Sequence, residues 1–301
     1  MSQVQLMRLK ELDAISEGQN ISFETAEERD REYQKLESKL VDVRRKELRE
    51  FQTHHRRPGL CLLESKLIDT LVRNGFSQVV TPTIMSKSLL AKISITEDHP
   101  LYNKIFWLDR KRCLRPMLAP HLYSVLQDLL RIWNKPVRIF EVGSCFRKET
   151  QGAQHSIEFT MLNLVEMGLP VEDCESRMNE LASLVTHAAG IEEYGLEEQQ
   201  SVVYGVTIDI VSPLHSHEKA MTAATNSAVA NSKGASKVKQ VMELGSAAAG
   251  PHILDRAWGI TEPWVGIGFG LERLLMAREK KESIGRWGRS LSYLDGIRLN
   301  L

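Results

Sequence analysis

Apolar residues recur along this chain with two periods, one typical of helices and one typical of strands. Residues 26–52 carry apolar side chains at helical spacing within a run dense in Glu, Lys and Arg, which predicts a long amphipathic helix. Residues 60–74, 119–133 and 171–190 predict three more helices. The first of these three ends at a glycine and the second opens with Ala-Pro, as helix ends and helix starts commonly do.

Strand-like segments occupy much of the remaining chain. Residues 201–211 alternate cleanly and place Tyr204 and Val206 on one face. Residues 76–85 contain Pro82, which cannot donate to a sheet ladder, so this strand is expected at an edge or a bulge. The other strand-like segments are 101–118 in short pieces, 137–167 as two strands joined by a polar turn, 241–249 and 264–270.

The order of these elements predicts an α+β fold, in which N-terminal helices precede a mostly antiparallel sheet flanked by helices. Residues 1–57 are expected to form a helical segment, and residues 58–301 one larger domain. Residues 212–240 are rich in Ala, Ser, Asn and Lys, which predicts a surface insertion. The glycines of residues 266–270 lie too near the C-terminus to open a dinucleotide-binding unit.

The composition of the chain says more about the cellular compartment of the protein than about its function. The formal net charge of the 301 residues is zero, so overall charge argues neither for nor against a nucleic-acid partner. No apolar run suits a membrane span, and the first residues do not resemble a signal peptide. Four scattered cysteines favour a reducing compartment over a disulfide framework, and His215-x-His217 lacks a third ligand nearby. We therefore expect a cytoplasmic protein without a membrane partner.

Two segments carry candidate chemistry. The predicted hairpin has Arg147 and Glu149 at the end of its first strand, where alternation places them on one face. Phe159, Met161, Asn163 and Val165 share a face of the return strand. Arginine suits phosphate, glutamate an exocyclic amine and phenylalanine the face of a base, so the hairpin predicts a nucleotide site.

The second segment is the glycine-rich strand that leads into the last helix. It reads Gly266-Ile267-Gly268-Phe269-Gly270-Leu271-Glu272-Arg273 and places Arg273 in the first helical turn. Alone, either arginine could form a surface salt bridge. A nucleotide site instead requires both arginines to face one cleft.

Three motifs in this order resemble the signatures of class II aminoacyl-tRNA synthetases. They are residues 75–82 ending in proline, Phe146-Arg147-Lys148-Glu149 followed by Glu158-Phe159, and residues 266–273. Further segments are similar to the catalytic domain of the pyrrolysyl-tRNA synthetase family, from about Pro58 to the end apart from the insertion. These segments are 114–126, 139–149, 155–168, 203–210, 264–275 and 289–301. The chain resembles the short form, which lacks a separate N-terminal tRNA-binding domain.

The resemblance implies ATP-dependent activation of an amino acid, with ATP and Mg²⁺ as cofactors. It assigns the α-phosphate and the substrate carboxylate to Arg147 and the γ-phosphate to Arg273. It assigns the adenine amine to Glu149 and the adenine ring to Phe159. The remaining implied ATP contacts are His155, Gly270, Glu243 and Ser246, the last two also as Mg²⁺ ligands. Strict alternation would put Glu243 and Ser246 on opposite faces, so a bulge or a bridging water is expected between them.

The resemblance also implies a deep apolar pocket for pyrrolysine or a close N-ε-acyl-lysine. Asn163 would hydrogen-bond the ε-amide carbonyl, and Tyr204 would cover the pocket from a mobile hairpin. The other implied lining residues are Met117, Ala119, Leu122, Tyr123, Leu126, Val165, Ala248 and Trp264. Leu122, Leu126 and Val165 could equally be plain core, and Asn163 could make a structural hydrogen bond.

The sequence departs from the family pattern at several positions near these segments. They are His121, Val206, Gly245, Ala248 and Ile267. These departures bear on side-chain specificity more than on activation chemistry. Another amino acid on the same fold and a catalytically silent paralogue are the alternative hypotheses, and the intact Arg147, Glu149, Glu243 and Arg273 count against the second.

The expected partners follow from the same resemblance. They are an amber-decoding tRNA, the amino-acid substrate and a second copy of the chain in a homodimer. Basic residues at the end of the first long helix are the candidates for tRNA contact, although a solvated helix face would look the same. They are Arg45, Lys46, Arg49, Arg56 and Arg57.

Overall fold

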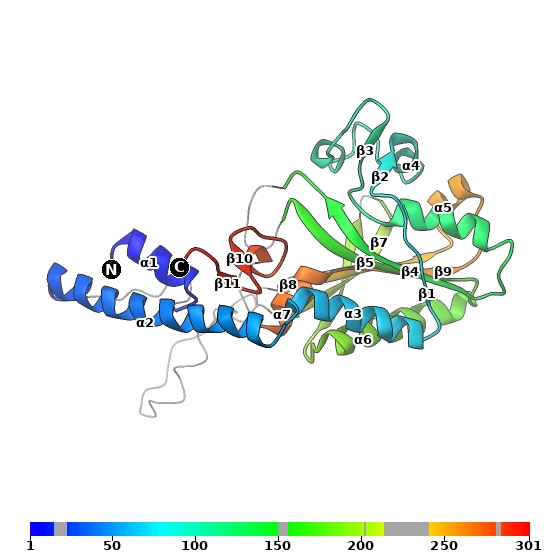
Figure 1. Ribbon diagram of the computed structural model, residues 1–301. Coiled ribbons are helices and arrows are strands. Elements are labelled where there is room, and N and C mark those ends of the chain that lie inside the picture. Colours follow the sequence, from blue (N-terminus) through cyan, green and yellow to red (C-terminus); the bar gives the residue numbers. More distant parts are fainter. Residues whose placement is uncertain (15–22, 150–155, 202, 214–240, 281–283) are drawn as a thin grey trace, which may run out of the picture.

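A seven-stranded, mixed sheet forms the centre of the molecule (Figure 1). The computed structural model describes residues 1–14, 23–149, 156–201, 203–213, 241–280 and 284–301. The strand order is β1-β4-β5-β9-β8-β7-β6, and only the β1–β4 pairing is parallel among the described strands. The bounds are β1 Ser77–Gln78, β4 Val137–Phe146, β5 Glu158–Met167, β6 Gly195–Ser201, β7 Gly205–Pro213, β8 Val241–Gly250 and β9 Trp264–Gly270.

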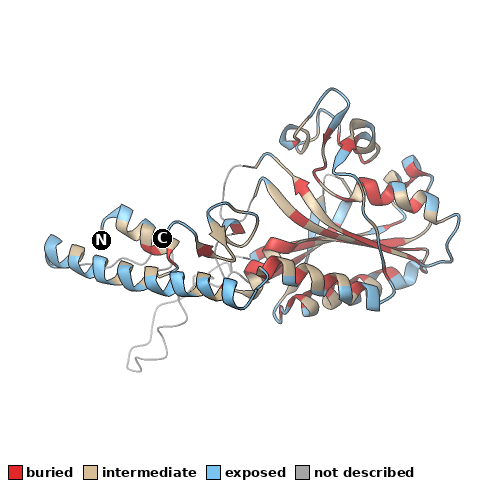
Figure 2. Ribbon diagram, in the orientation of Figure 1, coloured by how far each residue is buried: buried red, intermediate tan, exposed pale blue. Residues whose placement is uncertain are grey.

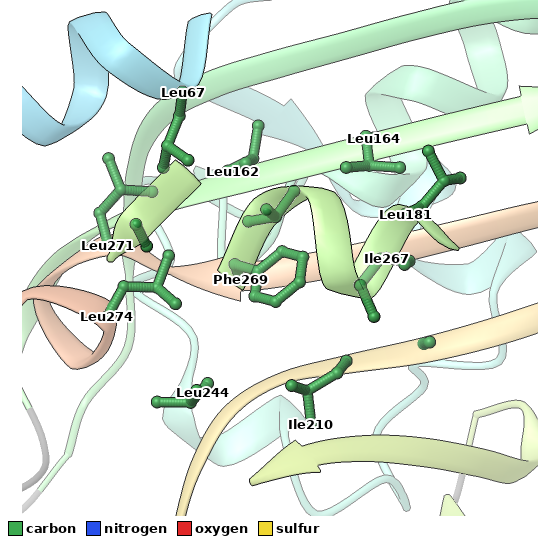
Figure 3. Packing of buried hydrophobic residues seen from close by; sticks show 14 of the residues in the cluster. Leu67, Leu162, Leu164, Leu181, Ile210, Leu244, Ile267, Phe269, Leu271 and Leu274 are labelled. Carbon is green, nitrogen blue, oxygen red and sulfur yellow. The ribbon is translucent and has the colours of Figure 1, made fainter. Parts of the chain in front are cut away.

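Three helices cover one face of this sheet and bury the larger hydrophobic core. They are α3 (Gly59–Arg73), α6 (Cys174–Ala189, after the 3₁₀ turn Val171–Asp173) and α7 (Leu271–Arg278). Leucines spaced along α3 share one buried cluster with strand residues such as Phe269, and Figure 3 shows members of this cluster, among them Leu67 of α3. The buried stripes in Figure 2 follow these contacts. Burial of a helical stripe against a sheet face is what fixes this layer.

A smaller layer covers the opposite face. It contains α5 (Ala119–Leu129), the short helix α4 (Lys87–Lys92), the 3₁₀ segments Tyr102–Lys104 and Ile253–Trp258, and the hairpin of β2 (Ile84–Ser86) with β3 (Arg112–Leu114). Its core joins Leu122 and Leu126 of α5 to Ile139, Val165 and Trp264 of the sheet. This layer leaves part of the sheet uncovered, and the cavity described below lies there.

The two ends of the chain pack together away from the sheet (Figure 1). Helix α1 (Gln3–Glu11) lies along α2 (Ala26–Thr53), where Arg44 donates to the carbonyl of Leu12 at 3.0–3.1 Å. Beyond the 3₁₀ turn Ile284–Arg286, the hairpin of β10 (Tyr293–Leu294) and β11 (Ile297–Arg298) reaches the same place. There Arg298 and Glu11 form an ion pair at 3.2 Å.

The predicted α+β class, the long helix over residues 26–52 and the antiparallel hairpin within 137–167 are confirmed. Three local predictions are wrong. Pro82 lies between β1 and β2 rather than inside a strand, although the expected edge position is confirmed for β1, and pairing ends soon after Val79, which donates to the carbonyl of Phe140 at 2.8 Å. Tyr204 belongs to the turn of a β6–β7 hairpin, since β7 begins at Gly205. Arg147 and Glu149 follow the end of β4 at Phe146 and are not strand residues.

The insertion predicted at 212–240, with its His215-x-His217 pair, lies almost wholly outside the described residues. Over the described part of the chain, no helix combines the length and the apolar character of a membrane span.

Candidate active site

One cavity of about 370 Å³ opens on the α5 face of the sheet. It is lined by β5, β8 and β9, by α5 and by the β6–β7 turn. All the predicted site residues line it except His155, which lies outside the described residues. They are Met117, Ala119, Leu122, Tyr123, Leu126, Arg147, Glu149, Phe159, Asn163, Val165, Tyr204, Glu243, Ser246, Ala248, Trp264, Gly270 and Arg273. Segments more than 150 residues apart in sequence thus contribute to one site.

Arg147 is held rigidly at the polar end of the cavity. Its backbone N–H donates to the carbonyl of Ile157 at 2.9 Å, and its Nε donates to the carbonyl of Pro116 at 3.0 Å. The guanidinium carbon lies 5.2 Å from the ring centroid of Phe159. Burial lowers the pKa of Arg147 from its usual value, and the nearby charge of Arg273 acts in the same direction. An anion bound here would favour the charged form of Arg147 and so offset the penalty of its desolvation.

Arg273 reaches the same polar end from the first turn of α7. Its Nη1 lies 3.1 Å from the backbone oxygen and 3.1 Å from Oε2 of Glu243. Glu149 is also ion-paired, since both its oxygens lie 3.0 Å from Nζ of Lys104. Arg273 and Glu149 therefore each have an ion-pair partner within the protein. A bound polyanion and its cation could take the place of these partners.

A β-bulge brings Glu243 and Ser246 to the same cavity. In the β7–β8 pairing Ile210 lies opposite Gly245 whereas Val211 lies opposite Glu243, so Leu244 is the extra residue. The bulge, one of the two alternatives that the sequence left open, changes the alternation, and both side chains line the cavity. Among the described residues no three His, Cys, Asp or Glu side chains gather as metal ligands. A hard cation such as Mg²⁺ would fit these two oxygen donors beside a phosphate, with further oxygens from phosphate and water.

The apolar end of the cavity is walled by aromatic rings. Tyr123 meets Trp264 edge to face with centroids 5.9 Å apart, and Tyr204 meets Trp264 at 6.1 Å. Burial raises the pKa of the Tyr204 phenol to about 12 and also raises that of Tyr123, so both hydroxyls are protonated donors at neutral pH. Leu122, Leu126 and Val165 belong to the buried core and also line the cavity, so packing in the core does not exclude these residues from the cavity wall.

Asn163 is the one amide in this apolar wall among the described lining residues. Its side chain makes no hydrogen bond within the described part of the chain, which argues against a structural role. It faces Gly268 on β9, where an added Cβ would lie 3.0 Å from Oδ1 of Asn163. The glycines of this strand therefore leave the amide open toward the cavity.

Most of the departures from the family pattern lie away from this wall. Ile267 points into the core under the helices, Val206 is exposed, and His121 is buried against Thr81. Only Gly245 and Ala248 line the cavity. An added Cβ on Gly245 would meet the backbone oxygen of Gly268, so close packing of β8 on β9 explains that glycine. Ala248 is therefore the departure that bears most directly on pocket size.

Sequence reasoning missed several lining residues. Met161 shares the face of Asn163, and this signal was visible in the alternation of the strand. Glu272 lines the cavity and accepts the backbone N–H of Thr160 at 2.9 Å through both oxygens. Three more lining residues come from the β6–β7 hairpin, where alternation predicts one continuous strand over 201–211; they are Ser201 at the end of β6, Val203 in the turn and Thr207 on β7.

His121 gives a prediction on stability. Its Nδ1 lies 3.2 Å from Oγ1 of Thr81, and burial lowers its pKa, with the charge of Arg115 acting in the same direction. The unfolded chain therefore takes up this proton at a higher pH than the folded chain, so His121 makes the fold less stable as pH falls through about 6.5. Thermal melting from pH 7.5 to 5.5 is expected to show the wild type losing a few degrees relative to His121→Asn. Parallel profiles for the two proteins would contradict this assignment.

Comparison with known proteins agrees with this geometry. Residues 41–287 match the family model described as tRNA synthetases class II core domain (F). The chain is thus a class II aminoacyl-tRNA synthetase by fold and by family.

Two solved structures of pyrrolysyl-tRNA synthetase from Desulfitobacterium hafniense narrow the family. One is 49% identical, with a TM-score of 0.84, and the match covers 100% of this chain and 98% of that one. The other, titled PylSc, is 46% identical, with a TM-score of 0.82 and coverage of 100% and 95%. The chain belongs to the pyrrolysyl-tRNA synthetase family.

Curated relatives match shorter regions. A threonine--tRNA ligase of Wolbachia sp. subsp. Brugia malayi is 30% identical over 101 residues, which are 32% of this chain and 16% of that enzyme. A histidine--tRNA ligase of Methanocaldococcus jannaschii is 29% identical over 125 residues, which are 38% of this chain and 28% of that enzyme. The chain thus matches only about a sixth to a quarter of the length of these relatives.

Proposed function

We propose that this protein activates pyrrolysine, or a close N-ε-acyl-lysine, with ATP and transfers it to an amber-decoding tRNA. The observation that carries the proposal is one cavity with two guanidinium groups at its polar end and an open amide in an aromatic wall at its other end. Residues 58–301 would form the catalytic domain and residues 1–57 a helical N-terminal segment.

The proposed reaction needs no protein nucleophile. A carboxylate oxygen of the amino acid attacks the α-phosphorus of ATP, and the bond from that phosphorus to the pyrophosphate oxygen breaks. A terminal hydroxyl of the tRNA then attacks the acyl carbon and expels AMP. The barrier comes from joining two anions, so positioned cations supply the catalysis.

Each group at the polar end has a proposed role. Arg147 would hold the α-phosphate and the carboxylate, and Arg273 the γ-phosphate. Glu149 would accept a hydrogen bond from the adenine amine, Phe159 would stack on the adenine, and His155 and Gly270 would contact the nucleotide. Mg²⁺ on Glu243 and Ser246 would neutralise phosphate charge when bound.

Each group at the apolar end would recognise the acylated side chain. Asn163 would donate to the ε-amide carbonyl, while Tyr204 would cover the entrance. The apolar wall would bind the bulky acyl group by burial; it consists of Met117, Ala119, Leu122, Tyr123, Leu126, Val165, Ala248 and Trp264.

Pyrophosphate exchange across a panel of amino acids tests this function. We expect exchange with N-ε-acyl-lysines and none with phenylalanine, threonine or histidine. Exchange with phenylalanine alone would favour the alternative of another amino acid on this fold. Absence of exchange with every amino acid would favour a silent paralogue.

The proposed metal role predicts a shifted Mg²⁺ requirement. Glu243→Gln keeps the shape of the side chain but removes a charged ligand, so the Mg²⁺ concentration for half-maximal exchange is expected to rise on the order of tenfold. The matched control is Glu198→Gln on β6, an exposed glutamate that does not line the cavity. Identical Mg²⁺ curves for Glu243→Gln and the wild type would remove Glu243 from the metal site.

The proposed partners rest on surface features. Arg45, Lys46 and Arg49 are exposed on α2, and Arg56 and Arg57 are exposed just after it, which suits a phosphate backbone. A homodimer that packs through the first motif, as the resemblance implies, would bury Val80, which is 86% exposed.

A further inference from the structure

A buried carboxylate lies directly behind the aromatic wall of the cavity. Asp255 is 1% exposed and belongs to the 3₁₀ segment Ile253–Trp258. Its Oδ1 accepts a hydrogen bond from the hydroxyl of Tyr123 at 3.1 Å. Its Oδ2 accepts from Nε1 of Trp264 at 2.8 Å and from the backbone N–H of His252 at 2.6 Å. Asp255 itself does not line the cavity, but both side chains that it binds do.

The partners of Asp255 are all neutral donors. Within the described part of the chain, no Lys or Arg forms an ion pair with this carboxylate. A buried carboxylate without a counter-cation is tolerated only when hydrogen bonds satisfy both oxygens, so its three donors are held in fixed positions. The constraint is mutual: Asp255 needs these donors, and their side chains cannot rotate without leaving it unsatisfied.

The bound side chains come from different parts of the fold. Tyr123 lies on α5 and Trp264 opens β9, so Asp255 joins the helix and the sheet that form the two sides of the wall. Tyr123 also stacks on Trp258 with centroids 5.3 Å apart. Tyr204 contacts His252, the N-cap residue of the same segment, edge to face at 5.9 Å. The 3₁₀ segment therefore supports all three rings of the wall.

We infer that Asp255 is a positioning residue that sets the aromatic wall and thereby the affinity and size preference for the acyl group of the substrate. The substrate named in this inference rests on the proposed function, whereas the geometry of the aromatic wall does not depend on that function. A residue that only stabilised the core would affect both ends of the cavity alike. A positioning residue acts on the amino-acid end and leaves the ATP end unchanged.

Asp255→Asn tests the inference in the full-length protein. The variant keeps the size of the side chain and one carbonyl oxygen for Trp264 and His252, but it places an NH₂ group opposite Tyr123. Steady-state pyrophosphate exchange is expected to show a KM for an N-ε-acyl-lysine raised about tenfold, with the KM for ATP within about twofold of wild type. The ratio of rates for a small and a bulky acyl group is expected to change as well.

A matched control separates position from stability. Glu166 is also a buried carboxylate, 2% exposed, on β5, but it pairs with Arg138 and Arg177 and does not line the cavity. Glu166→Gln is expected to lower the melting temperature without moving the KM for the amino acid. If Asp255→Asn behaves like this control, or raises both KM values together, the inference is overturned.

A second variant and a second measurement cover the remaining outcomes. If Asp255→Asn does not fold, Tyr123→Phe serves as the second variant, because it removes one donor and keeps the carboxylate. A raised KM for the amino acid with an unchanged KM for ATP would support the inference. Unchanged KM values for both substrates would oppose it. If the wild type exchanges with no acyl-lysine, the proposed function fails, and the indole N–H resonance of ¹⁵N-labelled Trp264 decides on the wall. Its displacement in Asp255→Asn supports the inference, and an unmoved resonance overturns it.

Discussion

Replacement of Arg147 by alanine is expected to lower pyrophosphate exchange by about three orders of magnitude and to leave the fold intact. Arg147 is the guanidinium that packs on Phe159 inside the cavity, and burial already penalises its charge. A cation held in a partly desolvated site stabilises developing phosphate charge more than it would in water, and loss of one such donor commonly costs 10²–10³ in rate. The effect should fall on kcat, because the charge is greatest in the transition state.

The matched control is Arg138, near the start of β4, whereas Arg147 directly follows the end of that strand. Arg138 pairs with Glu166 at 2.9 Å and does not line the cavity, so Arg138→Ala is expected to keep near wild-type exchange. Arg147→Lys should recover little, because an ammonium cannot reproduce the planar fork of a guanidinium. Near wild-type activity in Arg147→Ala, with circular dichroism showing a folded protein, would falsify the assignment of Arg147 to the α-phosphate.

The hairpin and the glycine strand could be predicted because alternation in a strand is local. Phe159, Asn163 and Val165 were placed on one face from sequence alone, and that face lines the cavity. The sequence left a bulge or a bridging water between Glu243 and Ser246 as alternatives, and the pairing of β7 with β8 contains the bulge. In each case a period of two residues fixed the direction of a side chain without knowledge of the tertiary fold.

Features that depend on distant partners could not be predicted in the same way. β4 ends before Arg147 because Lys148 donates instead to the carbonyl of Lys104, a contact outside the sheet. The alternation around Tyr204 predicts a strand residue because it continues through the hairpin turn in which Tyr204 lies. Asp255 carried no signal at all, since its role depends on Tyr123, 132 residues away.

Replacement of Asn163 by alanine is expected to lower kcat/KM for N-ε-acyl-lysines on the order of 10- to 100-fold. The open amide has no partner among the described residues and faces the cavity beside the glycines of β9. Loss of its hydrogen bond would leave the substrate carbonyl buried without a donor, which costs about 1–3 kcal/mol. Kinetics of pyrophosphate exchange measure the loss, and the KM for ATP should not change.

A substrate lacking the carbonyl separates recognition from folding. An amino acid with an all-carbon side chain of similar size offers neither an acceptor nor a charge to Asn163, so Asn163→Ala should affect its exchange far less than that of the acyl-lysine. This cycle isolates the pairwise contact, because both changes remove the same hydrogen bond. Equal losses for the two substrates, together with a lower melting temperature, would instead show that Asn163 supports the strand. The open amide would then be part of the scaffold, and recognition of the acyl group would rest on the aromatic wall alone.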